Sequence, residues 1–442
     1  MTDHTRISRT ASLSRILALA GGFLALLWLN LWFFGLPEVS FVQNDISYYA
    51  YHLNDMMVSG NTGVMPEYPM PAVWILAAIY TLGGGWQTWQ PLFAGLMIGL
   101  TAVVALTLYR PGREQGAWFW VLFTGACGPL IWFRFDLIPA AIVVWACLWM
   151  ATHPGLAGVL VAVGAAVKLW PALLAAPMAA PRPLRKGGAR TRLVAFLFAG
   201  SLLAVSSLVA VGWARTSSPL TWQRERGLQM ESVPATPLMF LRTFTHDTSW
   251  SVFLSEFNAI EVKGPGVGAM LAVSTVLTIG SLVLTAVLTW RLMRRFDEAS
   301  DDCLDAILLS MLAILLATVV ANKTLSPQYI PWLGGPVAVL LTTARAPRLR
   351  RHVHVQAIAM VLVAALTQIT YPWATQGIMG APNGQGLGTA ALVLRNVLLV
   401  AMLVHAVHLS WRSTAQTRTT RGRRAGEGSN DSVSFPVGGT AA

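Results

Sequence analysis

Two acids follow the first long apolar stretch of this chain, in which only 11% of the 442 residues are charged. Asp45 lies in Phe41-Val-Gln-Asn-Asp-Ile-Ser-Tyr-Tyr49, and Glu67 opens the segment Glu67-Tyr-Pro-Met-Pro71. A carboxylate with little water around it can act as a general base, and the aromatic residues around Asp45 could supply that setting. The alternative for Asp45 is structural, as a helix N-cap or as the ion-pair partner of a nearby arginine.

Isolated cations form a second group of candidate residues. Lys168 lies in the apolar segment Val163-Gly-Ala-Ala-Val-Lys-Leu-Trp-Pro171, where a charge is costly and usually functional. Its alternative role is to reach a lipid head group. Arg134 stands two residues before Asp136, so these two could neutralise each other in a tight turn. Otherwise Arg134 or Lys168 is suited to bind an anionic phosphate.

Polar residues also gather in two later segments. Arg226 and Glu231 lie in a run of alternating charges over 222–235, which could form a solvated amphipathic helix. Gly227 and the following Ser-Val-Pro-Ala-Thr-Pro favour a shaped turn instead. Lys323 and Gln328 lie in Asn322-Lys-Thr-Leu-Ser-Pro-Gln-Tyr329, whose formal glycosylation pattern we interpret as accidental.

The composition indicates an integral membrane protein. Hydrophobic residues make up 55% of the chain, and a soluble domain of this length would need far more polar surface. The net charge of +12 could attract nucleic acid, but Lys and Arg cluster in short loops and at the C-terminus, the pattern typical of cytoplasmic loops. We therefore expect no nucleic-acid partner. Cys127, Cys147 and Cys303 lack paired spacing and histidine partners, which predicts neither disulfides nor a metal site.

Apolar stretches predict the elements that must position the polar residues. Clear membrane spans are expected over 12–36, 88–109, 116–133, 191–213, 267–293, 304–321, 353–372 and 389–411. Short or interrupted segments occur over 70–83, 137–151, 155–168, 170–180 and 327–343. Broken helices are tolerated only where protein or a polar cavity surrounds them. We predict an all-α polytopic membrane protein with about eleven or twelve crossings, in which residues 70–83 form a half-helix.

Basic loops predict the orientation of these spans. The loops expected in the cytoplasm are 110–113, 182–192, 291–295, 345–351 and the C-terminal tail. The loops 37–69 and 214–266 then lie on the outer side, and all the charged candidates lie there or within a turn of it. We predict a single membrane domain over 1–411 and a disordered basic cytoplasmic tail over 412–442.

Several short motifs in chain order resemble the GT-C fold glycosyltransferases of family 87. They are Asn44-Asp-Ile-Ser-Tyr-Tyr49, Glu67-Tyr-Pro-Met-Pro71, Arg134-Phe-Asp136, Val167-Lys-Leu-Trp-Pro171, Arg226-Gly-Leu-Gln-Met-Glu-Ser232 and Ser326-Pro-Gln-Tyr329. Each motif is weak alone, whereas their shared order on one predicted face is fairly specific. The family pattern usually has a tyrosine followed by two consecutive prolines. This chain departs from it, because Met70 separates Pro69 from Pro71.

The resemblance implies a GT-C membrane enzyme in a bacterial plasma membrane, with its active site facing the periplasm. Such an enzyme transfers a sugar, commonly mannose and in some members arabinofuranose, from a polyprenyl-phosphate donor to a cell-envelope glycan or glycolipid. Asp45 matches the catalytic aspartate, the general base of an inverting reaction that yields an α-mannoside from a β-linked mannosyl donor.

Negative charge develops on the phosphate as it leaves, and nearby cations would stabilise it. Donor-phosphate binding is expected from Lys168, Arg134, Arg226 and Lys323, and substrate binding or support from Glu67, Tyr68, Tyr49, Asp136, Glu231 and Gln328. The first outer loop contains no Asp-x-Asp pair, so we expect no essential metal and no cofactor. Two other hypotheses are a lipid-sugar flippase or transporter, which predicts charges at the midplane and symmetric halves, and a non-catalytic scaffold for envelope assembly.

Overall fold

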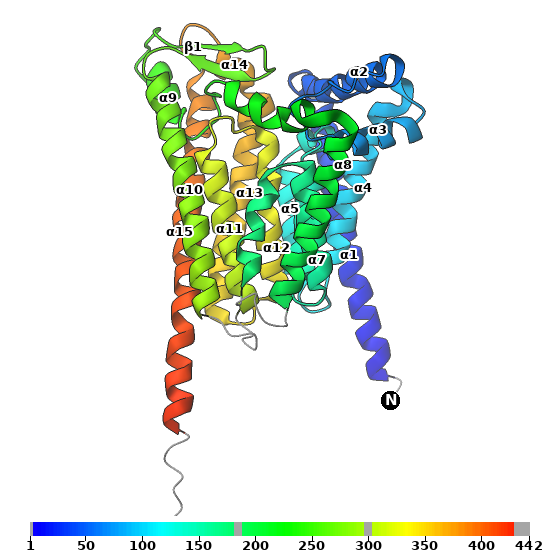
Figure 1. Cartoon of the computed structure of the whole chain (residues 1–442), viewed down its shortest axis with the longest axis vertical. Helices are drawn as coiled ribbons and strands as arrows, with labels where there is room; N and C mark the ends of the chain where they lie inside the picture. The colour runs from blue at the N-terminus through cyan, green and yellow to red at the C-terminus, as the bar shows by residue number, and fades with distance from the viewer. Residues whose placement is uncertain (1–2, 181–187, 296–302, 428–442) are drawn as a thin grey trace, which may run out of the picture.

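Long helices run side by side along the longest axis of the molecule and form one bundle (Figure 1). The computed structural model describes residues 3–180, 188–295 and 303–427. Within these ranges, seven helices are long and apolar enough to cross a membrane. They are α1 (Asp3–Phe34), α4 (Trp86–Leu108), α8 (Gly188–Glu225), α10 (Val267–Arg295), α11 (Cys303–Ala321), α13 (Pro347–Gln368) and α15 (Gly386–Glu427). The prediction of an all-α polytopic membrane protein is confirmed.

Shorter helices and turns complete the bundle, most of them where the sequence showed short or interrupted apolar segments. They are α5 (Gln115–Ala126), α6 (Leu137–Trp149), α7 (Pro154–Val167) and α12 (Gly334–Thr343), with the 3-10 turns η2 (Pro129–Phe133), η3 (Trp170–Ala175), η4 (Pro177–Ala179) and η5 (Pro327–Leu333). A helix of this length rises only about 20 Å. The turns that begin α6 and end α7 can therefore place Asp136 and Lys168 within the bundle.

The expected continuous span over 116–133 was wrong in one respect, because the chain breaks after α5. Gly128 adopts φ of 74°, a left-handed conformation that suits glycine. A Cβ atom at this position would lie 2.4 Å from Nε2 of Gln368 on α13, so the close approach also requires glycine. The chain then enters η2 in a new direction, and this turn leads directly to Arg134.

The expected disorder over 412–442 stays a prediction. Helix α15 continues to Glu427, and residues 428–442 lie outside the described ranges. The segment that follows the apolar part of α15 contains no proline, and its Ala, Arg and Gln residues are good helix formers. An established helix adds one hydrogen bond for each further residue, so it propagates past the apolar span.

A layer of short elements covers one end of the bundle (Figure 1). It comprises η1 (Pro37–Gln43), α2 (Asn44–Ser59), α3 (Met70–Leu82), α9 (Thr236–Phe244), β1 (Ser251–Leu254), β2 (Ile260–Lys263), the π-helical turn η6 (Ile369–Trp373) and α14 (Thr375–Met379). The two strands pair antiparallel, with Ser251 opposite Lys263 and Leu254 opposite Ile260. The N-terminus and the C-terminal end of α15 lie at the opposite end of the molecule (Figure 1).

Helix α2 carries Asp45 in its first turn. Its buried residues Ile46, Tyr49, Ala50 and Leu53 follow the spacing of one face of a helix. Gly60, with φ of 72°, ends the helix in the left-handed conformation typical of a C-cap. The indole nitrogen of Trp89 on α4 donates a 2.8 Å hydrogen bond to the carbonyl of Ile46, which fixes α2 across the end of α4.

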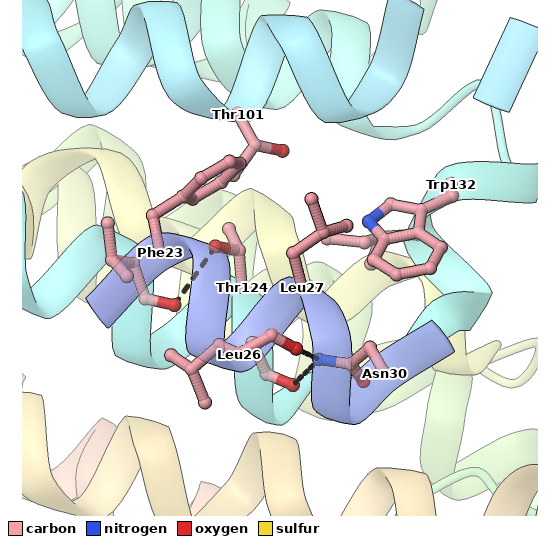
Figure 2. Close-up of a pocket in the computed structure, with 10 residues that line it drawn as sticks. Phe23, Leu26, Leu27, Asn30, Thr101, Thr124 and Trp132 are labelled. Atoms are coloured by element: carbon pink, nitrogen blue, oxygen red, sulfur yellow. Dashed lines mark hydrogen bonds between the residues drawn. The ribbon is translucent and has the colours of Figure 1, made fainter. Parts of the chain in front are cut away.

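A small internal cavity between α1, α4 and α5 tests whether the bundle itself holds a substrate site (Figure 2). Asn30 on α1 donates hydrogen bonds to the carbonyls of Leu26 and Gly125, so its amide ties α1 to α5. The cavity beside it measures about 20 Å³ and is lined mainly by apolar residues such as Phe23 and Leu27. This volume is enough for roughly one water molecule. This pocket is therefore too small for an organic ligand.

Candidate active site

A cavity of about 610 Å³ lies between the outer layer and the end of the bundle. Its walls come from α2, the loop before α3, the turn before α6, the end of α8, the β1–β2 hairpin, η5, η6 and α14. This volume is typical of a small-molecule binding site. The cavity brings together eight of the predicted site residues: Asp45, Tyr49, Glu67, Tyr68, Arg134, Arg226, Glu231 and Gln328.

Helix α2 presents a polar stripe to this cavity. Asn44, Asp45, Tyr48, Tyr49 and His52 all line it, and their spacing places them on one side of a helix. The opposite side carries the apolar residues that pack against the bundle. His52 was not predicted from the sequence, although its position seven residues after Asp45 on the same helix was the available signal.

Asp45 and Arg134 form an ion pair in the cavity wall. Oδ2 of Asp45 lies 2.9 Å from Nη1 of Arg134, and the two side chains are 25% and 6% exposed. Arg134 also donates to the carbonyl of Val42 at 3.0 Å and to the hydroxyl of Tyr371 at 3.1 Å. The partial exposure leaves Asp45 accessible from the cavity, and the more deeply buried Arg134 also lines it. Asp45 is therefore both an arginine partner and a cavity residue.

Burial raises the pKa of Asp45 above the usual carboxyl value, and the positive charge of Arg134 opposes this rise. Burial acts because a charged carboxylate is poorly solvated in the cavity wall. A carboxylate with a raised pKa is a stronger base than one in water. The surroundings of Asp45 thus suit proton abstraction.

Asp136 pairs with Lys168, so the expected neutralisation of Asp136 by Arg134 was wrong. Nζ of Lys168 lies 3.2 Å from Oδ1 of Asp136, and the indole nitrogen of Trp332 donates to the same oxygen at 3.0 Å. Asp136 is only 1% exposed, so without Lys168 it would be a buried uncompensated charge. Sequence proximity could not predict this pairing, because Lys168 belongs to another helix end.

Lys168 lies outside the residues that line the cavity. Its Nζ is 4.8 Å from the ring centroid of Tyr68, which does line the cavity, and the lysine side chain is 16% exposed. Its charge is already compensated by Asp136. Lys168 is therefore placed to support Tyr68 in the cavity wall. Its expected direct contact with a phosphate stays a prediction.

Two tyrosine contacts fix the loop that leads into α3. The hydroxyl of Tyr48 donates to Oε1 of Glu67 at 2.7 Å, and the hydroxyls of Tyr49 and Tyr68 lie 2.9 Å apart. Oε2 of Glu67 is buried without a hydrogen-bond partner in the described structure. An unpaired buried carboxylate oxygen is costly, so it is available to a ligand hydroxyl.

Arg215 on α8 holds the same loop from below and was missed in the sequence. Its Nη2 donates to the carbonyls of Val64, Met65 and Tyr68 at 3.0 to 3.1 Å. Guanidinium groups suit such convergent carbonyls because they present several donors in a fixed plane. The available signal was a single arginine just after the predicted span over 191–213.

The segment after α8 forms a second wall of the cavity. Nη2 of Arg226 lies 3.4 Å from Oε1 of Gln229, and its Nε is buried without a partner in the described structure. Arg134 likewise has a buried Nε without a partner there. Both guanidinium groups therefore retain hydrogen-bonding capacity at the cavity, and a bound anion would use it.

Glu231 and Lys323 support this wall rather than offering free charges. Glu231 is 1% exposed and pairs with Arg395, a fully buried residue of α15. Lys323 lies outside the cavity lining, and its Nζ donates to the carbonyls of Arg224 and Arg226. Lys323 thus shapes the Arg226 turn, and its predicted contact with a phosphate stays a prediction. Arg395 was not predicted as a site residue. Its position inside the predicted span over 389–411 was the available signal, because a charge inside an apolar span needs a buried partner.

Candidate metal ligands do not gather in the described ranges. Over residues 3–180, 188–295 and 303–427, no group of three or more His, Cys, Asp or Glu side chains could hold a metal ion. The cavity lining carries two arginines, Arg134 and Arg226, and four acids: Asp45, Glu67, Glu231 and Glu256.

The fold and the cavity define a polytopic membrane protein with a polar site at one end of its bundle. The sequence model described as glycosyltransferase family 87 matches residues 67–321, which is more than half of the chain. The chain therefore belongs to glycosyltransferase family 87 and is a membrane glycosyltransferase. No curated protein and no solved structure matched the chain. The matched range begins at Glu67, so the role of Asp45 rests on the cavity geometry and on the motif around it.

Proposed function

We propose that this glycosyltransferase moves a sugar, mannose, from a polyprenyl-phosphate donor to a hydroxyl group of a cell-envelope glycan or glycolipid. Asp45 is the general base, and the reaction inverts the configuration at the anomeric carbon. The observation that carries this proposal is the position of Asp45 in the wall of a large cavity that also presents Arg134 and Arg226. A carboxylate for the acceptor and cations for the donor are what such a transfer needs.

The reaction follows from these groups. Asp45 removes the proton from the acceptor hydroxyl. At the same time, the oxygen of that hydroxyl attacks the anomeric carbon from the face opposite the phosphate. The bond between the anomeric carbon and the phosphate oxygen breaks, and polyprenyl phosphate leaves with the electron pair. A phosphate is a weak base, so its departure requires no general acid. Arg226 and Arg134 stabilise its developing charge with hydrogen bonds from guanidinium nitrogens.

A lipid-linked donor is supported by the location of the cavity at the end of an apolar bundle (Figure 1). The prenyl chain can remain among lipids while the sugar phosphate enters the cavity. We assign this end of the bundle to the periplasmic side of a bacterial plasma membrane. The basic loops predicted to be cytoplasmic support this orientation, together with the position of the N-terminus at the other end.

Purified protein in nanodiscs tests the proposal with synthetic polyprenyl-phosphate mannose as donor and octyl α-mannopyranoside as acceptor. We expect Asp45→Asn to lower the turnover number by about 100-fold or more, because the amide cannot accept the proton. Product formation is measured by mass spectrometry, and the anomeric configuration by NMR. Polyprenyl-phosphate arabinofuranose serves as the alternative donor in a parallel assay.

Asp55→Asn is the matched control for this experiment. Asp55 lies on the same helix but is bonded to Ser59 and Asn61, away from the cavity lining. Its substitution should leave the turnover number unchanged. Full activity of Asp45→Asn would contradict the base assignment, and transfer of arabinofuranose alone would replace mannose as the donor sugar. Loss of activity in both variants would point to disturbance of α2 rather than to chemistry.

A further inference from the structure

The cavity has an aromatic region that the proposed chemistry does not use. Trp222 near the end of α8 and Phe257 in the β1–β2 turn both line the cavity. Their ring centroids lie 5.1 Å apart at an interplanar angle of 88°, an edge-to-face contact. Both side chains are only partly buried, although large aromatic rings normally gain free energy from full burial. We call this pair the aromatic shelf.

The shelf belongs to a rigid part of the outer layer. The amide of Ser255 donates to the carbonyl of Ala259 at 2.8 Å, which closes the turn that carries Phe257. The hairpin is fixed to the segment after α8, because Val262 donates to Leu228 and Met230 donates to Ile260, both at 2.9 Å. The hairpin that carries Phe257 is therefore held against the segment after α8 by backbone hydrogen bonds. Rigid presentation of this kind lowers the entropy cost of binding a ligand.

The position of the hairpin favours the acceptor over the donor as the ligand of the shelf. The β1–β2 hairpin lies at the extreme end of the molecule, beyond the ends of the bundle helices (Figure 1). A lipid-linked donor must reach the cavity from the bundle side because its tail remains in the bilayer. The sugar part of an acceptor, whether a free glycan or the head group of a glycolipid, lies on the aqueous side and meets the hairpin first.

The chemistry beside the shelf defines the class of acceptor. Glu256 and Asn258 flank Phe257 in the same turn and also line the cavity. A carboxylate repels anionic acceptors but accepts hydrogen bonds from sugar hydroxyls, and an amide can both donate and accept. Aromatic rings stack on the C–H faces of pyranose rings. The combination therefore fits a neutral carbohydrate.

We propose that Trp222 and Phe257 form a stacking site for a pyranose ring of a carbohydrate acceptor, with Glu256 and Asn258 bonding its hydroxyls. This inference deepens the proposed function and rests on it for the identity of the transfer reaction. The two residues determine acceptor affinity, whereas Asp45 performs the proton transfer. A free glycan and the head group of a glycolipid share this chemistry.

Kinetics with separate donor and acceptor titrations test the shelf. We expect Trp222→Ala and Phe257→Ala each to raise the KM for octyl α-mannopyranoside by about tenfold while the donor KM stays unchanged. Phe253→Ala is the matched control, since Phe253 is an exposed aromatic residue of the same hairpin but lies outside the cavity lining. Its KM values should equal those of wild type. An increase in donor KM instead of acceptor KM would overturn the proposal.

Direct binding separates this inference from the proposed transfer. Saturation-transfer NMR without donor is recorded with a soluble α-mannotrioside and with octyl α-mannopyranoside. Loss of both signals in Trp222→Ala supports the shelf even if no sugar transfer is found with any donor. Unchanged binding of both probes in a variant that still catalyses transfer overturns the shelf and leaves the transfer reaction standing. Loss for octyl α-mannopyranoside alone identifies a glycolipid head group as the acceptor source.

Leucine substitutions keep the test decisive if an alanine variant does not fold. Trp222→Leu and Phe257→Leu retain apolar volume at the contact but remove the flat ring face. We expect acceptor binding to fall as in the alanine variants, while Trp222→Phe and Phe257→Tyr retain it. Leucine variants that bind the mannotrioside as tightly as wild type would refute a stacking role.

Discussion

At the scale of single residues, two opposing effects set the pKa of Asp45. Burial raises its pKa, while the guanidinium of Arg134 at 2.9 Å opposes that rise. The unprotonated form is the base that the proposed transfer needs. Activity should therefore decline as the pH falls through the raised pKa of Asp45, which lies above the usual range of aspartate.

Replacing Arg134 by glutamine should move this decline to higher pH. The substitution removes the positive charge that favours the carboxylate, so the pKa of Asp45 rises further, and the acid limb of kcat/KM should shift upward by about one pH unit or more. The measurement is a pH profile of sugar transfer in nanodiscs. Arg134→Lys, which retains the charge, should shift the limb less.

Arg110→Gln is the control for a general loss of positive charge. Arg110 is exposed and bonds to backbone carbonyls of Thr107 and Tyr109 in a predicted cytoplasmic loop. Its profile should match that of wild type. An acid limb that stays in place or moves to lower pH in Arg134→Gln would show that Asp45 does not control the limb.

The sequence could predict those residues of the candidate site that are charged but lie in or beside apolar segments. Asp45 and Lys168 were identifiable because charges are rare in an apolar chain. Their partners were not identifiable, since Arg134 and Asp136 are neighbours in sequence yet pair with different residues. Pairing depends on distances between helix ends, which no local sequence pattern encodes.

At the scale of elements, the break between α5 and η2 positions Arg134. Gly128 makes this break possible through its left-handed backbone and its close contact with Gln368. Length and hydropathy predicted a continuous span here, because an apolar pattern does not show whether a helix is interrupted. Gly128 is followed by Pro129, a pair that favours a turn, and the packing of Gln368 against Gly128 fixes this turn in the fold.

Substitution of Gly128 by alanine should destabilise the protein. A Cβ atom would be strained at φ of 74° and would lie 2.4 Å from Nε2 of Gln368. We expect a loss of about 1–3 kcal/mol and a lower thermal unfolding midpoint, measured by intrinsic fluorescence in detergent. Transfer activity should fall too, because Arg134 follows this turn.

Gly95→Ala provides the matched comparison. Gly95 lies in α4 with nothing within 4 Å of a built Cβ, so alanine should be tolerated or should slightly stabilise the helix. Equal unfolding midpoints for the two variants would mean that the conformation of Gly128 is not required.

At the scale of the whole molecule, the chain separates an apolar bundle from a polar layer at one end (Figure 1). The cavity lies between them, so a membrane-bound donor and a water-borne acceptor can meet there. The orientation of this end determines on which side of the membrane the proposed transfer takes place. It can be tested with single introduced cysteines.

The native cysteines Cys127, Cys147 and Cys303 are buried, so they offer a low background for labelling. We expect a membrane-impermeant maleimide to label Asn258→Cys in spheroplasts, because Asn258 is exposed in the outer hairpin turn. Arg113→Cys should react only after the membrane is permeabilised, since the positive-inside rule places its loop in the cytoplasm. The opposite labelling pattern would invert the proposed orientation.

The sequence by itself determined the class of protein, the positions of most helices and the side of the bundle on which the polar residues gather. These properties follow from hydropathy and charge, which act along the chain and can be counted. It also identified Asp45 as the central acid, because a carboxylate beside an apolar span is exceptional.

Tertiary structure decided which of the predicted cations line the cavity. Arg134 and Arg226 line the cavity, whereas Lys168 and Lys323 are used by Asp136 and by backbone carbonyls. It also brought in Arg215, Tyr371 and Arg395 from distant helices. The physical reason is that a buried charge must be compensated by whichever group packing brings within hydrogen-bonding distance, and that packing joins segments far apart in the chain.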